Sequence, residues 1–129
     1  GKIMKKKKSG VIINVSSIYG LVAADQRIYG KSGLNSTVAY AITKSAVLNL
    51  TRYLASYWGK TGIRINSLSL GGVESGQDSR FIKKYSHKTM LGRMAKTEEY
   101  VGSMLYLASD ASTYMTGSNL IVDGGWTAW

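Results

Sequence analysis

The chain has 129 residues, no cysteine and one histidine, and its formal net charge is +10. The lack of cysteine excludes disulfides, thiolate nucleophiles and cysteine-bound metals, and a single histidine excludes a histidine-rich metal site. The length suits one compact domain, which we place at residues 1–129. No apolar run approaches the roughly 18 residues that span a bilayer, and no signal peptide is recognisable, so we expect a cytoplasmic protein.

Much of the positive charge lies in the run Lys5–Lys8, near the start of the chain. A solvated loop or helix end explains such a run, and a nucleic-acid surface is the alternative. No basic stripe interleaved with aromatic residues supports the alternative. We therefore expect no nucleic-acid partner.

The first element in chain order is an apolar run, Val11–Val15, which predicts a buried strand of the parallel type that Ser16 and Ser17 end. Residues 18–37 are rich in Gly, Ser, Asn and Lys and show no period. They predict a long loop with a short helical piece, and loops of that length are usually functional.

Val38–Trp58 is the strongest helical segment. Ser36 or Thr37 can cap its start, and Gly59 ends it. Helical spacing predicts a core-facing stripe on this helix. Its members are Val47, Leu50, Leu54 and Tyr57.

Ile63–Leu68 alternates apolar and polar residues and predicts a second strand. Residues 73–95 are polar and irregular, with a short helix near 79–86, as in a substrate loop. Thr97 is expected to cap a further helix, and 119–123 predicts a third strand. The buried stripe expected on that helix consists of Val101, Met104, Leu105 and Ala108. Strands that alternate with helices imply a parallel sheet with crossover helices.

Tyr40 and Lys44 lie four residues apart in the first turns of the long predicted helix. Residues at this spacing share one helix face, so the two side chains point the same way. A nearby ammonium favours the phenolate form of a tyrosine, whose ordinary pKa near 10 is too high for proton exchange at neutral pH. The pair therefore predicts a general acid or base, although Tyr-x-x-x-Lys alone also occurs as an ordinary surface pair.

Two further features lie where predicted strands end. Ser16 and Ser17 close the first strand, and Gly71, Gly72 and Val73 follow the second. The carboxyl ends of parallel strands form the ligand-binding edge of open α/β sheets, and glycines let a ligand approach the backbone closely. Strand alternation lets only one of the two serines face such a cleft and leaves open which one.

Segments along nearly the whole chain resemble the short-chain dehydrogenase/reductase family. Tyr40–Lys44 matches the family's Tyr-x-x-x-Lys signature, and Ser9–Ser17 is similar to the strand that carries its active-site serine. The other similar segments are Thr61–Asn66, Leu91–Met94 with Thr97–Glu99, Leu107–Asp110 and Thr116–Gly125. The resemblance implies the C-terminal half of a three-layer, Rossmann-type α/β fold with about three parallel strands.

The resemblance also implies a role for individual residues. Tyr40 would be the catalytic acid or base, and Lys44 would hold the ribose of a nicotinamide cofactor, NAD or NADP. Ser17, favoured over Ser16 by family position, would polarise the reacting oxygen, and Gly71 and Val73 would meet the nicotinamide. The implied activity is the NAD(P)-dependent interconversion of a small-molecule alcohol and a ketone, with no metal.

The family's glycine-rich, dinucleotide-binding half has no counterpart in the sequence. We therefore expect this chain alone to bind a dinucleotide poorly, because the backbone site that holds the phosphates at a helix N-terminus is missing. The alternative function is a truncated, non-catalytic fragment or a partner subunit.

Three local departures from the family pattern also matter. Leu70 stands where the family usually has proline, so the loop after it is less fixed. Tyr40 follows Ser17 by 23 residues, a longer gap than is usual in the family, and the extra segment near 25–36 should border the substrate cleft. Ser75 stands near the place of a threonine that contacts the cofactor, and we expect it to take that role.

Members of the family are usually dimers or tetramers, so the resemblance implies a homodimer or homotetramer. The predicted helix 38–58 and the aromatic ending Gly125–Trp129 are the candidate interfaces. The Ile28–Gly30 segment and the Gly-Trp ending are similar to members from bacterial surface-sugar or flagellar-glycan pathways, which suggests a sugar-like substrate.

Overall fold

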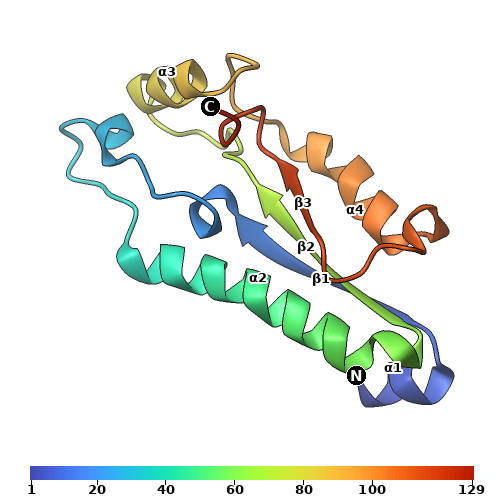
Figure 1. Ribbon diagram of the computed structural model, residues 1–129. Helices are drawn as coiled ribbons and strands as arrows, with labels where there is room; N and C mark the ends of the chain where they lie inside the picture. The colour runs from blue at the N-terminus through green and yellow to red at the C-terminus, as the bar shows by residue number, and fades with distance from the viewer.

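The computed structural model describes all 129 residues and contains one sheet of three parallel strands, in the order β1-β2-β3. The strands are β1 (Gly10–Ser17), β2 (Ile63–Leu70) and β3 (Asn119–Val122). In the register of the sheet, Ser17 lies opposite Leu70, which in turn lies opposite Val122. The carboxyl ends of all three strands therefore meet at one edge, as predicted (Figure 1).

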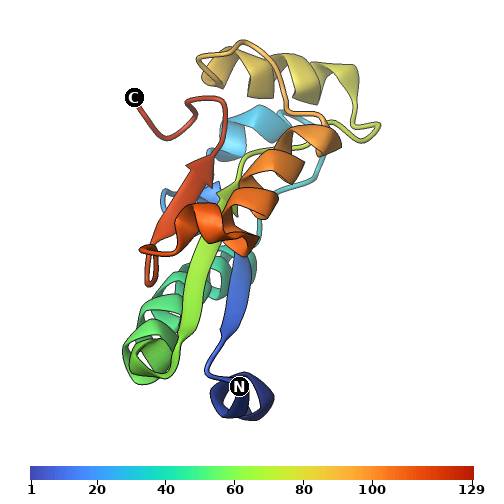
Figure 2. The same cartoon turned by 90° about the vertical axis from the view of Figure 1, so that its right-hand side faces the viewer.

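Two helices cover opposite faces of this sheet: α2 (Val38–Trp58) and α4 (Val101–Ala108), as the two views show (Figures 1 and 2). The shorter helices are α1 (Lys2–Lys7) and α3 (Ser79–Lys88). The predicted α/β class with a three-layer arrangement is confirmed. None of the helices combines the length and the apolar character that crossing a membrane requires.

Helix α2 has the predicted bounds, but its buried face differs from the predicted stripe. Thr37 caps the helix, accepting a hydrogen bond from the Tyr40 N–H at 3.3 Å. Val47 and Leu54 of the predicted stripe are partly buried, but Leu50 and Tyr57 are exposed, which corrects the prediction for these two. The helix fully buries Leu48, Thr51 and Ala55. The predicted stripe counted apolar residues only and so missed Thr51, which is buried against the sheet where Asn14 Nδ2 of β1 donates to its Oγ1 at 2.9 Å.

The predicted stripe of α4 is also wrong. Val101, Met104, Leu105 and Ala108 are exposed, and the helix buries Leu107 instead. Thr97 does not cap this segment. The Glu99 carboxylate accepts from the Lys96 N–H at 2.8 Å and pairs with Arg93, so it closes the first turn in place of Thr97.

Strand β2 is buried on both faces because it is the central strand of the sheet and has α2 on one face and α4 on the other. Its polar residues are therefore paired rather than solvated: Asn66 Nδ2 donates to Met115 O at 2.8 Å, and Ser69 Oγ donates to Asn119 Oδ1 at 2.9 Å. Strand β1, predicted as buried, lies at the edge of the sheet, and Val15 is exposed.

A hydrophobic cluster lies beyond the carboxyl ends of the strands and is centred on Trp126. The Trp126 ring is 5% exposed and stacks on the Tyr85 ring with 4.3 Å between centroids. Ile18, Ile28 and Met94 complete this cluster. The ending Gly125–Trp129 was a candidate interface, and the structure corrects this for Trp126, which packs within the chain. Trp129 remains exposed.

Candidate active site

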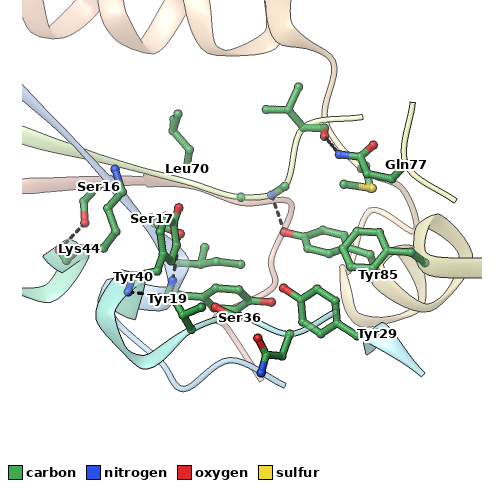
Figure 3. Close-up of a pocket in the computed structure, with 18 of the residues that line it drawn as sticks. Ser16, Ser17, Tyr19, Tyr29, Ser36, Tyr40, Lys44, Leu70, Gln77 and Tyr85 are labelled. Atoms are coloured by element: carbon green, nitrogen blue, oxygen red, sulfur yellow. Dashed lines mark hydrogen bonds between the residues drawn. The ribbon is translucent and has the colours of Figure 1, made fainter. Parts of the chain in front are cut away.

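A cleft of about 590 Å³ opens at the carboxyl ends of β1 and β2. Its walls come from α2, the segment 18–37 and α3. Among the predicted site residues, Ser17, Tyr40, Lys44, Gly71 and Val73 all line it. Figure 3 shows Ser17, Tyr40 and Lys44 on one side of this cleft and Tyr29, Gln77 and Tyr85 on the other.

The first turns of α2 supply Tyr40 and Lys44 to the cleft. The Lys44 Nζ lies 5.7 Å from the centre of the Tyr40 ring and donates to the carbonyl oxygen of Val15 at 3.1 Å. The Tyr40 side chain is partly exposed. The ammonium therefore lies beside the phenol, held in place by the backbone of β1.

The two serines at the end of β1 both border the cleft, so the expectation that only one would face it is corrected. Their hydroxyls differ in what they bond. Ser16 Oγ donates to the carbonyl oxygen of Lys44 at 2.7 Å, whereas Ser17 Oγ accepts from the Tyr19 N–H at 3.2 Å. Because Ser17 accepts here, its own proton is free to be donated to a ligand.

Gly20 supports the site from behind the cleft lining, and the sequence reasoning missed it. A Cβ atom at this position would lie 2.6 Å from the carbonyl oxygen of Lys44. Only glycine therefore lets α2 approach the end of β1 closely enough for the bond between Ser16 and Lys44. The available signal was a glycine three residues after Ser17, in a segment with no regular period.

The loop after β2 is held by several backbone bonds despite Leu70 in place of proline. The Gly71 N–H donates to Val122 O at 2.9 Å, and the Gly72 N–H donates to the Tyr85 hydroxyl. The Tyr85 ring therefore packs directly against Gly72, and a Cβ atom at position 72 would lie only 2.6 Å from that ring. The Val73 N–H has no acceptor within the chain and is available to a ligand.

Ser75 is the one predicted site residue that the structure places outside the cleft. It is exposed, and its N–H donates to Gln77 Oε1 at 2.7 Å. Gln77 in turn donates from Nε2 to Val73 O at 2.8 Å, so it is Gln77 that reaches the cleft from this turn.

Three further phenols line the cleft: Tyr29 and Tyr85 form its far wall, and Tyr19 lies nearer Tyr40 (Figure 3). Burial raises the pKa of Tyr85 to about 12, and burial, followed by the neighbouring Tyr29, raises the pKa of Tyr19 further. Both therefore stay protonated at neutral pH. They can hydrogen-bond a ligand but do not exchange protons with it there.

Asp25 ties the segment 25–36 to the end of α3. Its carboxylate accepts from Arg27 Nε and Nη2, both at 2.8 Å, and forms an ion pair with Lys88. These hydrogen bonds, first those of Arg27 and then that of Lys88, hold the pKa of Asp25 well below its ordinary value. The segment predicted to border the cleft is thus fixed in that position.

Comparison with known proteins decides the family. Residues 1–127 match the profile of the family described as enoyl-(acyl carrier protein) reductase. The structure superposes with a TM-score of 0.91 on a short chain dehydrogenase from Leptospira borgpetersenii with bound NAD⁺, which is 45% identical. The chain belongs to the short-chain dehydrogenase/reductase family.

Curated relatives within this short-chain dehydrogenase/reductase family include the post-translational flagellin modification protein A of Campylobacter coli. That protein is 35% identical over 97% of this chain and 49% of its own length. Sorbose reductase of Candida albicans is 39% identical over 98% of this chain and 44% of its own length. The chain thus spans about half the length of the curated relatives it matches.

Solved relatives carry nicotinamide cofactors. The Leptospira structure covers 98% of this chain, which spans 48% of that protein. A gluconate 5-dehydrogenase from Burkholderia cenocepacia in complex with NADP and tartrate is 30% identical with a TM-score of 0.88, and the match covers 99% of this chain and 49% of that one. Both NAD⁺ and NADP therefore occur among close structural relatives.

The substitution Asp25→Asn is expected to loosen segment 25–36 without affecting the sheet. The amide cannot pair with Lys88 and Arg27 as a carboxylate does, so backbone amides of 25–36 should exchange hydrogen faster, while those of β2 stay unchanged. Hydrogen exchange read by mass spectrometry measures this, with Asp110→Asn as a control whose side chain forms no hydrogen bond.

The same substitution carries a pH signature. Because the folded-state pKa of Asp25 is lowered, the contact contributes stability above the unfolded pKa of about 3.9 and loses it only as the pH falls towards the lower folded value. For each amide of 25–36, the ratio of the exchange rate in the variant to that in the natural protein should be constant from about pH 5 to 8. A ratio that changes within that range would contradict the assignment.

Proposed function

We propose that residues 1–129 form the C-terminal, catalytic part of an NAD- or NADP-dependent oxidoreductase that interconverts an alcohol and a ketone. The observation that carries the proposal is the meeting of three groups in one cleft. These are a serine hydroxyl with a free proton at Ser17, the phenol of Tyr40, and the ammonium of Lys44 beside that phenol. Membership of the family, whose relatives include dehydrogenases and reductases, supports the same assignment.

The residues of the cleft suit a nicotinamide cofactor. In this proposal Lys44 and Tyr40 hold the ribose hydroxyls, and the free N–H of Val73 donates to the carboxamide oxygen. Gly71 borders the same space, but its N–H and C=O are already bonded to Val122 and Tyr100. It would therefore contact the cofactor only by van der Waals packing and not by a hydrogen bond. When bound, such a cofactor takes up or gives back the hydride.

The proton follows a separate path along this chain's own residues. Ser17 Oγ–H donates to the substrate oxygen and fixes its position. The Tyr40 phenol oxygen takes the hydroxyl proton when the alcohol is oxidised and returns it when the ketone is reduced. The Lys44 ammonium stabilises the negative charge that Tyr40 carries in between. Ser16 takes no part, since its proton is bonded to Lys44 O.

We further propose a polyhydroxylated substrate, such as a sugar alcohol or a keto-sugar. The cleft offers the hydroxyls of Tyr19, Tyr29 and Tyr85, a dense set of hydrogen-bonding groups. Relatives named as a sorbose reductase and a flagellin modification protein support this class and a role in a bacterial surface-sugar pathway.

A homo-oligomer and a cytoplasmic location complete the proposal. Helix α2 leaves one apolar side uncovered, formed by Ile42, Leu50, Tyr53 and Tyr57. A second copy of the same helix would bury these side chains, as expected for a dimer contact.

The complete natural protein tests the proposed reaction. Mannitol and other sugar alcohols are offered with NAD⁺ or NADP⁺, and the absorbance of reduced nicotinamide is followed. We expect reduction of the cofactor that requires both the alcohol and the protein. A protein that binds the cofactor but oxidises no alcohol, and reduces no ketone in the reverse assay, would support the non-catalytic alternative.

A further inference from the structure

We propose that the substrate carries an anionic group, a carboxylate or a phosphate, which binds Lys31 and Lys84 in a second cavity beside the catalytic cleft. This inference rests on the proposed function and names the class of its substrate: an acidic or phosphorylated polyhydroxy compound.

The second cavity lies between the segment 28–34 and α3 and has a volume of about 460 Å³. It shares Tyr29, Gln77 and Phe81 with the catalytic cleft, so the two spaces adjoin along these side chains. Figure 3 shows Tyr29 and Gln77 on the side of the cleft that is remote from Lys44. A ligand that reacts beside Tyr40 can therefore extend past Tyr29 into this cavity.

The cavity holds more positive than negative charge. Four charged side chains line it, and two of them neutralise each other, because Asp78 pairs with Arg80 at 3.2 Å. Lys31 forms neither an ion pair nor a side-chain hydrogen bond. Lys84 donates only to the carbonyl oxygen of Arg27, at 3.2 Å. Two lysines thus line one cavity with no carboxylate of the chain to balance them.

The carboxylate that lies closest in sequence to this segment is already engaged. Asp25 is bonded by Arg27 and Lys88, and it does not line the cavity. Two like charges in one cavity repel, and an anion between them removes that repulsion and gains two charge-assisted hydrogen bonds. The net charge of +10 further favours the approach of an anion.

The remaining lining of the cavity fits the carbon chain of such a compound. Ile28, Leu34 and Phe81 are apolar, and the Ser32 hydroxyl, which accepts from the Leu34 N–H, keeps its proton to donate. A neutral polyol would leave both lysines without an anionic partner. The geometry therefore favours a substrate with hydroxyls beside Tyr40 and an anion at its far end.

A matched set of three probes tests the proposal in the complete natural protein at constant ionic strength. Mannitol is neutral, mannonate has a carboxylate in place of one terminal CH₂OH group, and mannitol 1-phosphate has a phosphate on one terminal hydroxyl. We expect a kcat/KM at least about tenfold higher for one or both anions than for mannitol, and which anion gains shows whether the site prefers carboxylate or phosphate. The double variant Lys31→Ala/Lys84→Ala should bring that ratio close to one, through KM.

Lys83→Ala is the matched control, because Lys83 is a lysine of the same helix that does not line the cavity. It should keep the preference for the anion. Equal kcat/KM for all three probes, or a preference that survives in the double variant, overturns the proposal.

Calorimetric titration separates this proposal from the proposed function. If no polyol is oxidised, the proposed function fails, but binding of mannitol 1-phosphate and mannonate still decides the anion site. Binding of either anion that is tighter than that of mannitol, and that is lost in Lys31→Ala/Lys84→Ala but kept in Lys83→Ala, supports the site. Failure of both anions to bind more tightly than mannitol overturns it.

Discussion

Replacement of Tyr40 by phenylalanine is expected to lower the kcat of the complete natural protein by roughly 10²- to 10⁴-fold, the range of general acid–base catalysis. The substitution removes only the phenol oxygen and leaves the ring beside Lys44. Because Tyr40 is partly exposed at the start of α2, no core cavity forms, and the unfolding temperature should stay unchanged. Steady-state kinetics and thermal unfolding together measure both effects.

Tyr114→Phe provides the matched control, since Tyr114 is fully exposed and lies outside the cleft. It removes the same atom and should leave kcat unchanged. Turnover of Tyr40→Phe at the natural rate would remove Tyr40 from the mechanism. Loss of activity together with loss of the folded state would instead assign Tyr40 a structural role.

Replacement of Trp126 by alanine is expected to reduce the free energy of unfolding by about 3–5 kcal/mol, the range for large aromatic residues in cores. The ring is 5% exposed, stacks on Tyr85 and lies 5.3 Å from the Lys88 ammonium. Its removal leaves a cavity behind the far wall of the cleft, so substrate KM should rise as well. Urea unfolding of the complete natural protein measures the loss of stability.

Trp129→Ala separates burial from aromatic character. Trp129 is also a tryptophan of the C-terminal segment, but it is 78% exposed, and its one hydrogen bond is Nε1 donating to Lys88 O at 2.8 Å. Its loss should cost about 1 kcal/mol, the usual net value of one hydrogen bond. Equal losses in the free energy of unfolding for the two variants would show that burial of the Trp126 ring does not account for its contribution to stability.

The parts of the fold that were predicted from sequence are those with local causes. Helix α2 begins after a residue that can cap it and ends at Gly59, so both bounds could be read from neighbouring residues. The buried faces of α2 and α4 could not be predicted in this way. They depend on partners far along the chain, such as Asn14, which bonds Thr51 across 37 residues. Apolar spacing alone cannot reveal a polar contact of this kind.

The candidate site divides in the same way. Spacing and resemblance indicated Ser17, Tyr40 and Lys44, and all three line the cleft. Tyr19 and Tyr85 were missed because their positions depend on packing against Trp126 from the other end of the chain. Ser75 was expected in the cleft by position, but its turn folds around Gln77 and points it outward.

Different contacts position the catalytic groups and the opposite side of the cleft, and the two sides meet through the Gly72–Tyr85 bond and the Trp126 cluster. Gly20 and the bond from Ser16 to Lys44 fix the side that would transfer the proton. The Asp25–Lys88 ion pair and the stacking of Tyr85 on Trp126 fix the opposite side. Substitutions in segment 25–36 or in α3 that keep Ile28 and Tyr85 can therefore accumulate without moving the catalytic groups. Such a scaffold can change its substrate over evolutionary time while it retains its chemistry.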